Sequence, residues 1–202
     1  MNRLGLLRSV TVALGALILS SCSESRLPDP TAPVQALSDH GSDGGQLNTA
    51  TSGARLKALW WERRYDRAIS VSKTIDASGG TISIPQTGLT VSLPKGAVAS
   101  PLKITITADR DYVAYKFDPA GTTFLKDVTV TQQLTNTTVF GEPLRNQLYA
   151  AYIADDNIKL SGNVPVLEIE PSTTIFSTLN PLLPQAQVWT IRHFSRYMLA
   201  SD

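Results

Sequence analysis

The sequence predicts an all-β fold, an antiparallel β-sandwich, for residues 68–202. From Ile69 onward, apolar residues recur at every second position in short runs, which is the period of a strand with one buried face. Turn-forming residues separate these runs about every ten positions, and no amphipathic segment after Arg67 is long enough for the helical crossover that parallel strands need. Two antiparallel sheets packed face to face are the simplest arrangement, and a closed barrel is the alternative.

Glycine and proline mark the ends of the expected strands. Gly79-Gly80 and Lys95-Gly96-Ala97 supply turns, while Pro85 and Pro94 end the strands before them. A domain of about 135 residues can bury a core without disulfides. The expected strands cover residues 69–75, 82–84, 89–93, 102–106, 113–117, 128–132, 148–153, 166–169, 174–176 and 188–192.

The N-terminus has the features of a secretory signal over residues 1–21. Arg3 and Arg8 precede an apolar run that is too short to cross a bilayer. The quartet Leu19-Ser20-Ser21-Cys22 resembles the bacterial lipoprotein signal, in which the cysteine becomes the lipidated N-terminus. This resemblance implies a lipid bilayer as a partner, through diacylglycerol and a further acyl chain such as palmitate on Cys22. An ordinary secreted protein cut near Ser21 is the alternative.

The residue after the cysteine bears on localisation. Ser23 stands where an Asp would retain enterobacterial lipoproteins in the inner membrane, so the resemblance favours the outer membrane of the cell envelope. The domain is then expected in the periplasm or on the cell surface. Residues 22–53 are rich in Pro, Gly and Ser, with little apolar surface to offset the entropy of ordering them, and we expect a flexible tether. In the alternative, part of the tether, Val34 to Leu37, packs on the domain.

Charge and cysteine content exclude several function classes. Removal of Arg3 and Arg8 with the signal leaves 16 basic and 17 acidic residues, a net charge of −1, which gives no electrostatic footprint for nucleic acid. Cys22 is the only cysteine, so the folded part has no disulfide, iron–sulfur ligation or cysteine catalysis.

Residues 54–67 form a short aromatic and basic segment. Leu56, Leu59, Trp60 and Arg63 fall at helical spacing, which predicts one or two helical turns. Trp60 and Trp61 either form a patch that meets lipid headgroups or a partner, or form a clasp that covers one end of the domain. We favour the clasp, because adjacent exposed tryptophans promote aggregation.

Five sequence blocks resemble a known family. They are Gly79–Pro85, Leu89–Val98, Ile104–Ile106, Phe117–Phe124 and His193-Phe194-Ser195. In this order they are similar to the ZU5 domain, an immunoglobulin-like β-sandwich of zonula occludens proteins, netrin receptors, ankyrins and bacterial surface proteins. The likeness covers roughly residues 69–200.

The sequence departs from the family pattern at two positions. Asp127 stands where the family usually has proline, and Arg196 stands where bacterial members often have glycine. Gly80, Gly96 and Gly121 are expected at turn positions with positive φ, as residues of the fold and not of a site.

The resemblance also implies one candidate for chemistry. In some ZU5 domains His-Phe-Ser is a self-cleavage site, and the resemblance implies an N-to-O acyl shift. Ser195 Oγ would attack the Phe194 carbonyl while His193 takes its proton, the Phe194–Ser195 amide would break as the ester forms, and water would then hydrolyse that ester. The apolar face shifts from odd positions, Trp189 and Ile191, to even ones, Phe194 and Met198, which predicts a bulge or kink at His193–Phe194. In the alternative, the three residues serve only packing and strand pairing.

Other residue clusters indicate neither metal nor cofactor binding. His40 lies in the tether and His193 in the last predicted strand, so no two-histidine metal site is predicted. Asp155-Asp156-Asn157 lacks the remaining ligands of a calcium loop, and, like Asp109-Arg110-Asp111, it is interpreted as a turn.

Three functions follow in order of preference. The first is a lipid-anchored envelope module that binds a protein or glycan and has no metabolic catalysis. The second is a self-processing domain that cleaves between Phe194 and Ser195. The third is a hydrolytic or carbohydrate-acting enzyme, which would require a cleft with paired carboxylates.

Overall fold

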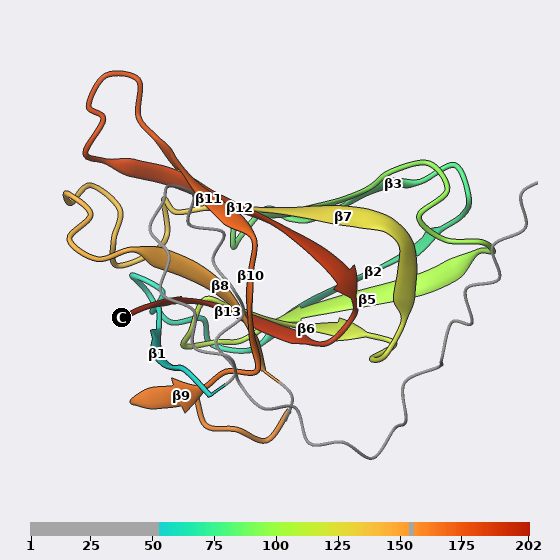
Figure 1. Cartoon of the computed structure of the whole chain (residues 1–202), viewed down its shortest axis with the longest axis horizontal. Helices are drawn as coiled ribbons and strands as arrows, with labels where there is room; N and C mark the ends of the chain where they lie inside the picture. The colour runs from blue at the N-terminus through green and yellow to red at the C-terminus, as the bar shows by residue number, and fades with distance from the viewer. Residues whose placement is uncertain (1–52, 154–155) are drawn as a thin grey trace, which may run out of the picture. The chain divides into compact units, whose positions relative to one another are not determined.

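The computed structural model describes residues 53–153 and 156–202, all within the unit Gln46–Asp202 of the chain. These residues form two antiparallel β-sheets packed as a sandwich, which confirms the predicted fold class (Figure 1). In this part of the chain, no helix has the length and apolar character needed to cross a membrane. The predicted signal, the lipidation site Cys22 and the tether up to residue 52 lie outside the described residues.

The larger sheet has eight strands. Its main path runs β10-β8-β13-β6-β5-β2, and β1 joins it by pairing with β13, while β9 pairs with β1. The strands are β1 (Arg55–Ala58), β2 (Ile69–Ile75), β5 (Leu102–Ala108), β6 (Ala114–Asp118), β8 (Leu148–Ile153), β9 (Asn163–Pro165), β10 (Glu168–Glu170) and β13 (Arg196–Ser201).

The smaller sheet has five strands in the order β11-β12-β7-β4-β3. Two of them extend well beyond the predicted ranges, because their ends pair with each other past the alternating apolar segment. The strands are β3 (Gly80–Ile84), β4 (Leu89–Leu93), β7 (Thr123–Gln133), β11 (Ser172–Phe176) and β12 (Pro184–His193).

The main core lies between the two sheets and contains the inward-facing residues of the predicted alternation. Burial of these side chains is the main favourable term in forming the sandwich. Among its largest fully buried side chains are Trp189, Tyr115, Tyr197, Phe117 and Phe194, together with Ile75 of β2 and the isoleucines of β3 and β5.

A second, smaller apolar cluster involves alternate residues of the last strand. In β13, Tyr197 and Leu199 belong to the main core, while Met198 and Ala200 pack in the second cluster with Leu56 and other side chains. Both faces of β13 are therefore covered, and Met198 does not share the main-core face of Phe194 as its even position predicted. This explains why the sequence lacked an alternating signal here, and why no strand was predicted after His193.

The aromatic segment differs from the expected helical turns. Residues 55–58 form strand β1, because Lys57 and Ala58 pair with the end of β13. Trp61 is buried in the main core and its Nε1 donates to the Asp109 carbonyl oxygen at 2.9 Å. Trp60 is partly exposed and lies against the ring of Tyr112. Trp61 thus covers the core as the clasp interpretation expected, while Trp60 remains exposed.

Candidate functional site

The His193-Phe194-Ser195 motif lies where the chain leaves the smaller sheet and enters the larger one. His193 ends β12, and Arg196 begins β13. The pairing of β12 with β7 shifts register between Ile191 and His193. The expected break in the strand is therefore present as an irregularity of pairing next to His193, and its extra residues lie on β7, between Thr123 and Val128, rather than on β12.

Phe194 is fully buried at this sheet change. Its ring stacks on Phe117 at 5.4 Å and meets Phe124 edge-on at 4.6 Å. Its backbone is bonded on both sides: the Phe194 N–H donates to Thr122 O at 2.8 Å, and the Gly121 N–H donates to Phe194 O at 2.9 Å. Gly121 has φ of 78°, as predicted for this turn. Packing and hydrogen bonding thus fix the middle of the motif.

The two predicted catalytic side chains are not hydrogen-bonded to each other. Among the described residues, the ring of His193 contacts the Tyr197 hydroxyl, with 3.3 Å between Nδ1 and the oxygen. The same hydroxyl donates to the His193 carbonyl oxygen at 2.8 Å. The backbone carbonyl oxygen of Ser195 accepts a hydrogen bond from the Phe117 N–H at 2.9 Å. The structure therefore holds His193 toward β13 and its tyrosine.

Asp127, the first departure from the family pattern, forms a specific contact. Its Oδ1 lies 2.6 Å from Nε of Arg192 on β12. A proline at this position would supply no side-chain acceptor for that arginine. The side chain of Arg192, the residue before His193, is therefore paired with Asp127.

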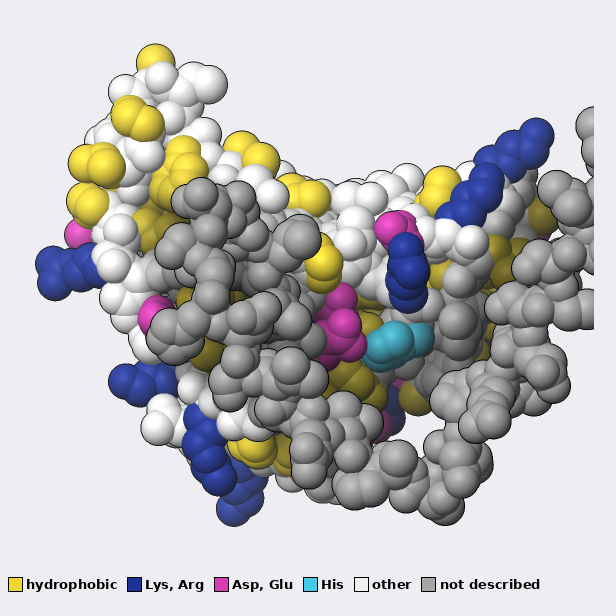
Figure 2. All heavy atoms as spheres, in the orientation of Figure 1, with side chains coloured by type: hydrophobic (Ala, Val, Ile, Leu, Met, Phe, Trp, Pro, Cys, Tyr) yellow, Lys and Arg dark blue, Asp and Glu magenta, His cyan; other side chains and the backbone are white. Residues whose placement is uncertain are grey.

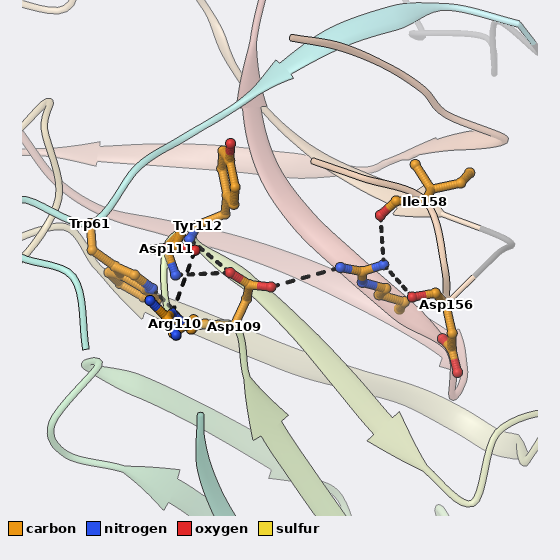
Figure 3. A network of polar contacts seen from close by, with 8 residues as sticks. Trp61, Asp109, Arg110, Asp111, Tyr112, Asp156 and Ile158 are labelled. Carbon is orange, nitrogen blue, oxygen red and sulfur yellow. Dashed lines mark hydrogen bonds and ion pairs between the residues drawn. The ribbon is translucent and has the colours of Figure 1, made fainter. Parts of the chain in front are cut away.

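Arg196, the second departure, forms a larger network. Its Nη1 donates to the carbonyl oxygens of Asp156 and Ile158, and its Nη2 lies 3.8 Å from Asp109 Oδ2. The Asp109 carboxylate also accepts the backbone N–H groups of Asp111 and Tyr112 (Figure 3). Arg196 therefore joins the loop after β8 to the β5–β6 turn, and we interpret the residue as structural.

A cluster that the sequence did not predict surrounds His193. Glu168 and Glu170 are two residues apart on β10, so both side chains lie on one face of the strand. One ligand atom each from Glu168, Glu170 and His193 lies within 4.8 Å of the others. These residues line a pocket of about 380 Å³ together with Asp127 and Arg192. Figure 2 shows the histidine side chain next to acidic side chains.

Burial perturbs the acid–base properties of this cluster. The pKa of Glu170 is raised to about 7, first by desolvation and then by the nearby charge of Glu168. Burial also raises the pKa of the Tyr197 hydroxyl, with a further contribution from the charge of Glu170, so this hydroxyl stays protonated at neutral pH. Both glutamates come from one strand, so they do not face each other across a cleft as paired glycosidase carboxylates do.

A second surface feature lies on the β11–β12 hairpin, whose loop extends beyond the body of the sandwich (Figure 1). No ionisable side chain occurs between Pro171 and Ile191. Leu179 is 95% exposed and Leu182 is 61% exposed. Ile175 and Phe176, on the strand that leads to the loop, are also exposed, and Figure 2 shows apolar side chains gathered on this projection. We call these four residues the hairpin surface.

Hydrogen bonds give the loop of this hairpin a defined shape. The Ser177 N–H donates to Leu183 O at 2.9 Å, and the Leu182 N–H donates to Asn180 Oδ1 at 3.1 Å. The Leu144 N–H, from a neighbouring loop, donates to Leu182 O at 3.2 Å. A loop held in this way loses less entropy when it binds than a free segment would.

The two packed sheets define an antiparallel β-sandwich that carries an exposed apolar hairpin. The family model described as ZU5 domain matches residues 71–112. This stretch runs from β2 to the turn after β5 and contains the first three of the five blocks, so the resemblance is confirmed there. A comparison with curated proteins gives no match.

Proposed function

We propose that this protein is a lipid-anchored module of the cell envelope that binds a protein partner through the hairpin surface. The observation that carries the proposal is the exposure of Leu179 and Leu182 at the end of a hydrogen-bonded, uncharged hairpin. Exposed apolar residues gathered on one projection favour association. The ZU5 match supports a role in protein interaction. In this proposal the domain carries out no metabolic catalysis.

The chemistry of the hairpin indicates the kind of partner. Because no charged side chain lies between Pro171 and Ile191, the complementary surface is expected to be an uncharged, apolar groove. A protein surface fits better than a lipid surface, since membrane-binding segments combine apolar residues with lysine or arginine, and this hairpin has neither of these basic residues.

The test compares three forms of the full chain in envelope extracts. A double variant, Leu179→Ser with Leu182→Ser, removes the two most exposed leucines of the hairpin. The control variant, Leu125→Ser, removes an exposed leucine of β7 that lies outside the hairpin. We expect the wild type and Leu125→Ser to retain the same co-purifying protein and the double variant to lose it. Equal retention by all three forms would contradict the proposal.

The anchor is tested separately by detergent phase partition. The proposal expects the native protein in the detergent phase, with an acyl mass on Cys22, and Cys22→Ser in the aqueous phase. A native protein with unmodified Cys22 in the aqueous phase would remove the anchor from the proposal and leave the hairpin surface untouched.

Self-processing between Phe194 and Ser195 is the second candidate function. One observation favours it: the Gly121 N–H already donates to the Phe194 carbonyl oxygen, where it would stabilise developing negative charge. The intact mass of the purified protein tests this candidate. Two fragments that disappear in Ser195→Ala would support it, and a single uncut species in both forms would end it.

A further inference from the structure

We propose that Glu168, Glu170 and His193 form a binding site for one divalent transition-metal ion of the zinc type. The three side chains come from two of the points where the chain changes sheets: β10 ends at Glu170 just before β11, and β12 ends at His193 just before β13. Their ligand atoms lie within 4.8 Å of one another at the wall of a pocket of about 380 Å³. This inference goes beyond the proposed function and does not depend on the hairpin surface.

The charge of the pocket favours a cation. Among the described residues, neither Glu168 nor Glu170 is within ion-pair distance of a lysine or arginine. The arginine at the pocket, Arg192, is paired with Asp127 at 2.6 Å. Two carboxylates close together without a counter-charge are unfavourable in the metal-free protein, and a bound divalent ion would relieve that repulsion.

Glu170 gives an independent indication of a ligand. It is 7% exposed and lies against the pocket, yet no described residue forms a hydrogen bond or ion pair with its carboxylate. Its carboxylate oxygens are not among the fully buried, unpaired side-chain atoms of the described residues, so they are open to the pocket, where a ligand can reach them. A metal ion in the pocket would supply the missing partner.

The hydroxyl of Tyr197 sets the tautomer of the His193 ring that metal binding requires. Its hydroxyl donates its proton to the His193 carbonyl oxygen at 2.8 Å, so toward the ring it can act only as an acceptor. That assigns the ring proton to Nδ1 and leaves the lone pair of Nε2 available to a metal. A second group that fixes the tautomer of a ligating histidine is a regular feature of metal sites.

The ligand types select the ion. One imidazole and two carboxylates suit zinc and its neighbours, while calcium and magnesium prefer oxygen ligands alone. Bonds of about 2 Å bring tetrahedral ligand atoms to about 3.3 Å from one another, so modest side-chain rotations would close the present arrangement round an ion. Three protein ligands leave the fourth position open to water from the pocket.

The test measures zinc binding by the full chain, purified in detergent without a histidine tag and stripped with EDTA. We expect one zinc ion per chain by equilibrium dialysis with metal analysis. Glu170→Gln and His193→Ala should each lower the affinity on the order of tenfold or more. X-ray absorption should show nitrogen and oxygen ligands and no sulfur.

Matched variants distinguish binding at this site from binding elsewhere on the chain. Glu142→Gln removes an exposed glutamate outside the pocket, and His40→Ala removes the other histidine, so both should bind zinc as the wild type does. Glu170→Gln keeps the shape of the side chain and removes a buried charge, so its metal-free melting temperature should be unchanged or higher. A wild type that binds no zinc, equal binding by Glu170→Gln, or a sulfur ligand from Cys22 would each overturn the proposal.

Discussion

Substitution of Phe194 tests whether the His-Phe-Ser motif is a packing element. The side chain is fully buried and its ring contacts those of Phe117 and Phe124. Truncation of a buried phenylalanine to alanine costs about 3–5 kcal/mol, and each ring pair contributes about 0.5–1.5 kcal/mol beyond area burial. We therefore expect Phe194→Ala to lower the free energy of unfolding by about 4 kcal/mol.

A conservative variant keeps the test interpretable. Domains of this size have unfolding free energies of about 5–15 kcal/mol, so Phe194→Ala can bring the protein close to unfolding. Phe194→Leu keeps most of the buried volume and should cost about 1.5 kcal/mol. Leu125→Ala, at an exposed position next to Phe124, should change the unfolding free energy by less than about 0.5 kcal/mol.

The assay is equilibrium unfolding in urea, followed by tryptophan fluorescence. Trp189 is buried in the main core and should report the loss of the sandwich. A change below about 1 kcal/mol in Phe194→Ala would refute the reasoning, because no fully buried ring with two aromatic neighbours should be so readily replaced.

Three further predictions concern stability, each measured by urea unfolding. In EDTA, the free energy of unfolding should fall as pH rises from about 4.5 to about 7, because the native state keeps a proton on Glu170 that the unfolded state has lost. The expected decrease in that free energy is on the order of 2 kcal/mol after allowance for water in the open pocket. The variant Glu170→Gln should abolish this pH dependence. Tyr115→Phe removes the donor to Gln132 Oε1 at 2.5 Å and leaves a buried acceptor unpaired, which should cost about 1–3 kcal/mol. Gly79→Ala should cost about 2 kcal/mol or more, since Gly79 has φ of 80° and a Cβ there would lie 2.4 Å from Leu93 O. A flat pH profile, or wild-type stability in either of the last two variants, would contradict the respective argument.

The strands whose positions the sequence predicted best have one face exposed to solvent and the other face in the core. Residues 69–93 alternate because the polar side chains of β2, β3 and β4 face solvent while the apolar ones enter the core. Strand β13 lacked this signal, because the core covers one of its faces and the second apolar cluster covers the other. The single strand expected over 166–169 is replaced by two short ones, β9 and β10, that pair with different neighbours.

Of the two features at the candidate site, one was predictable from the local sequence and the other was not. The break in pairing next to His193 was predictable, because a change of apolar face is visible in the local sequence. The cluster with Glu168 and Glu170 was not, since about 25 residues separate these glutamates from His193 and only the return of the chain to the larger sheet brings them together. The pair two residues apart, Glu168 and Glu170, was the one local signal that could have drawn attention to it.

Site-specific photo-crosslinking from residue 179 in living cells tests the interaction proposal most directly. The crosslinker replaces Leu179 at the end of the hairpin, and a control chain carries it in place of Lys103, an exposed residue of β5 in the larger sheet. We predict a discrete adduct with one envelope protein from position 179 and none from position 103. The same adduct from both positions, no adduct from position 179, or an adduct with lipid alone would contradict the account.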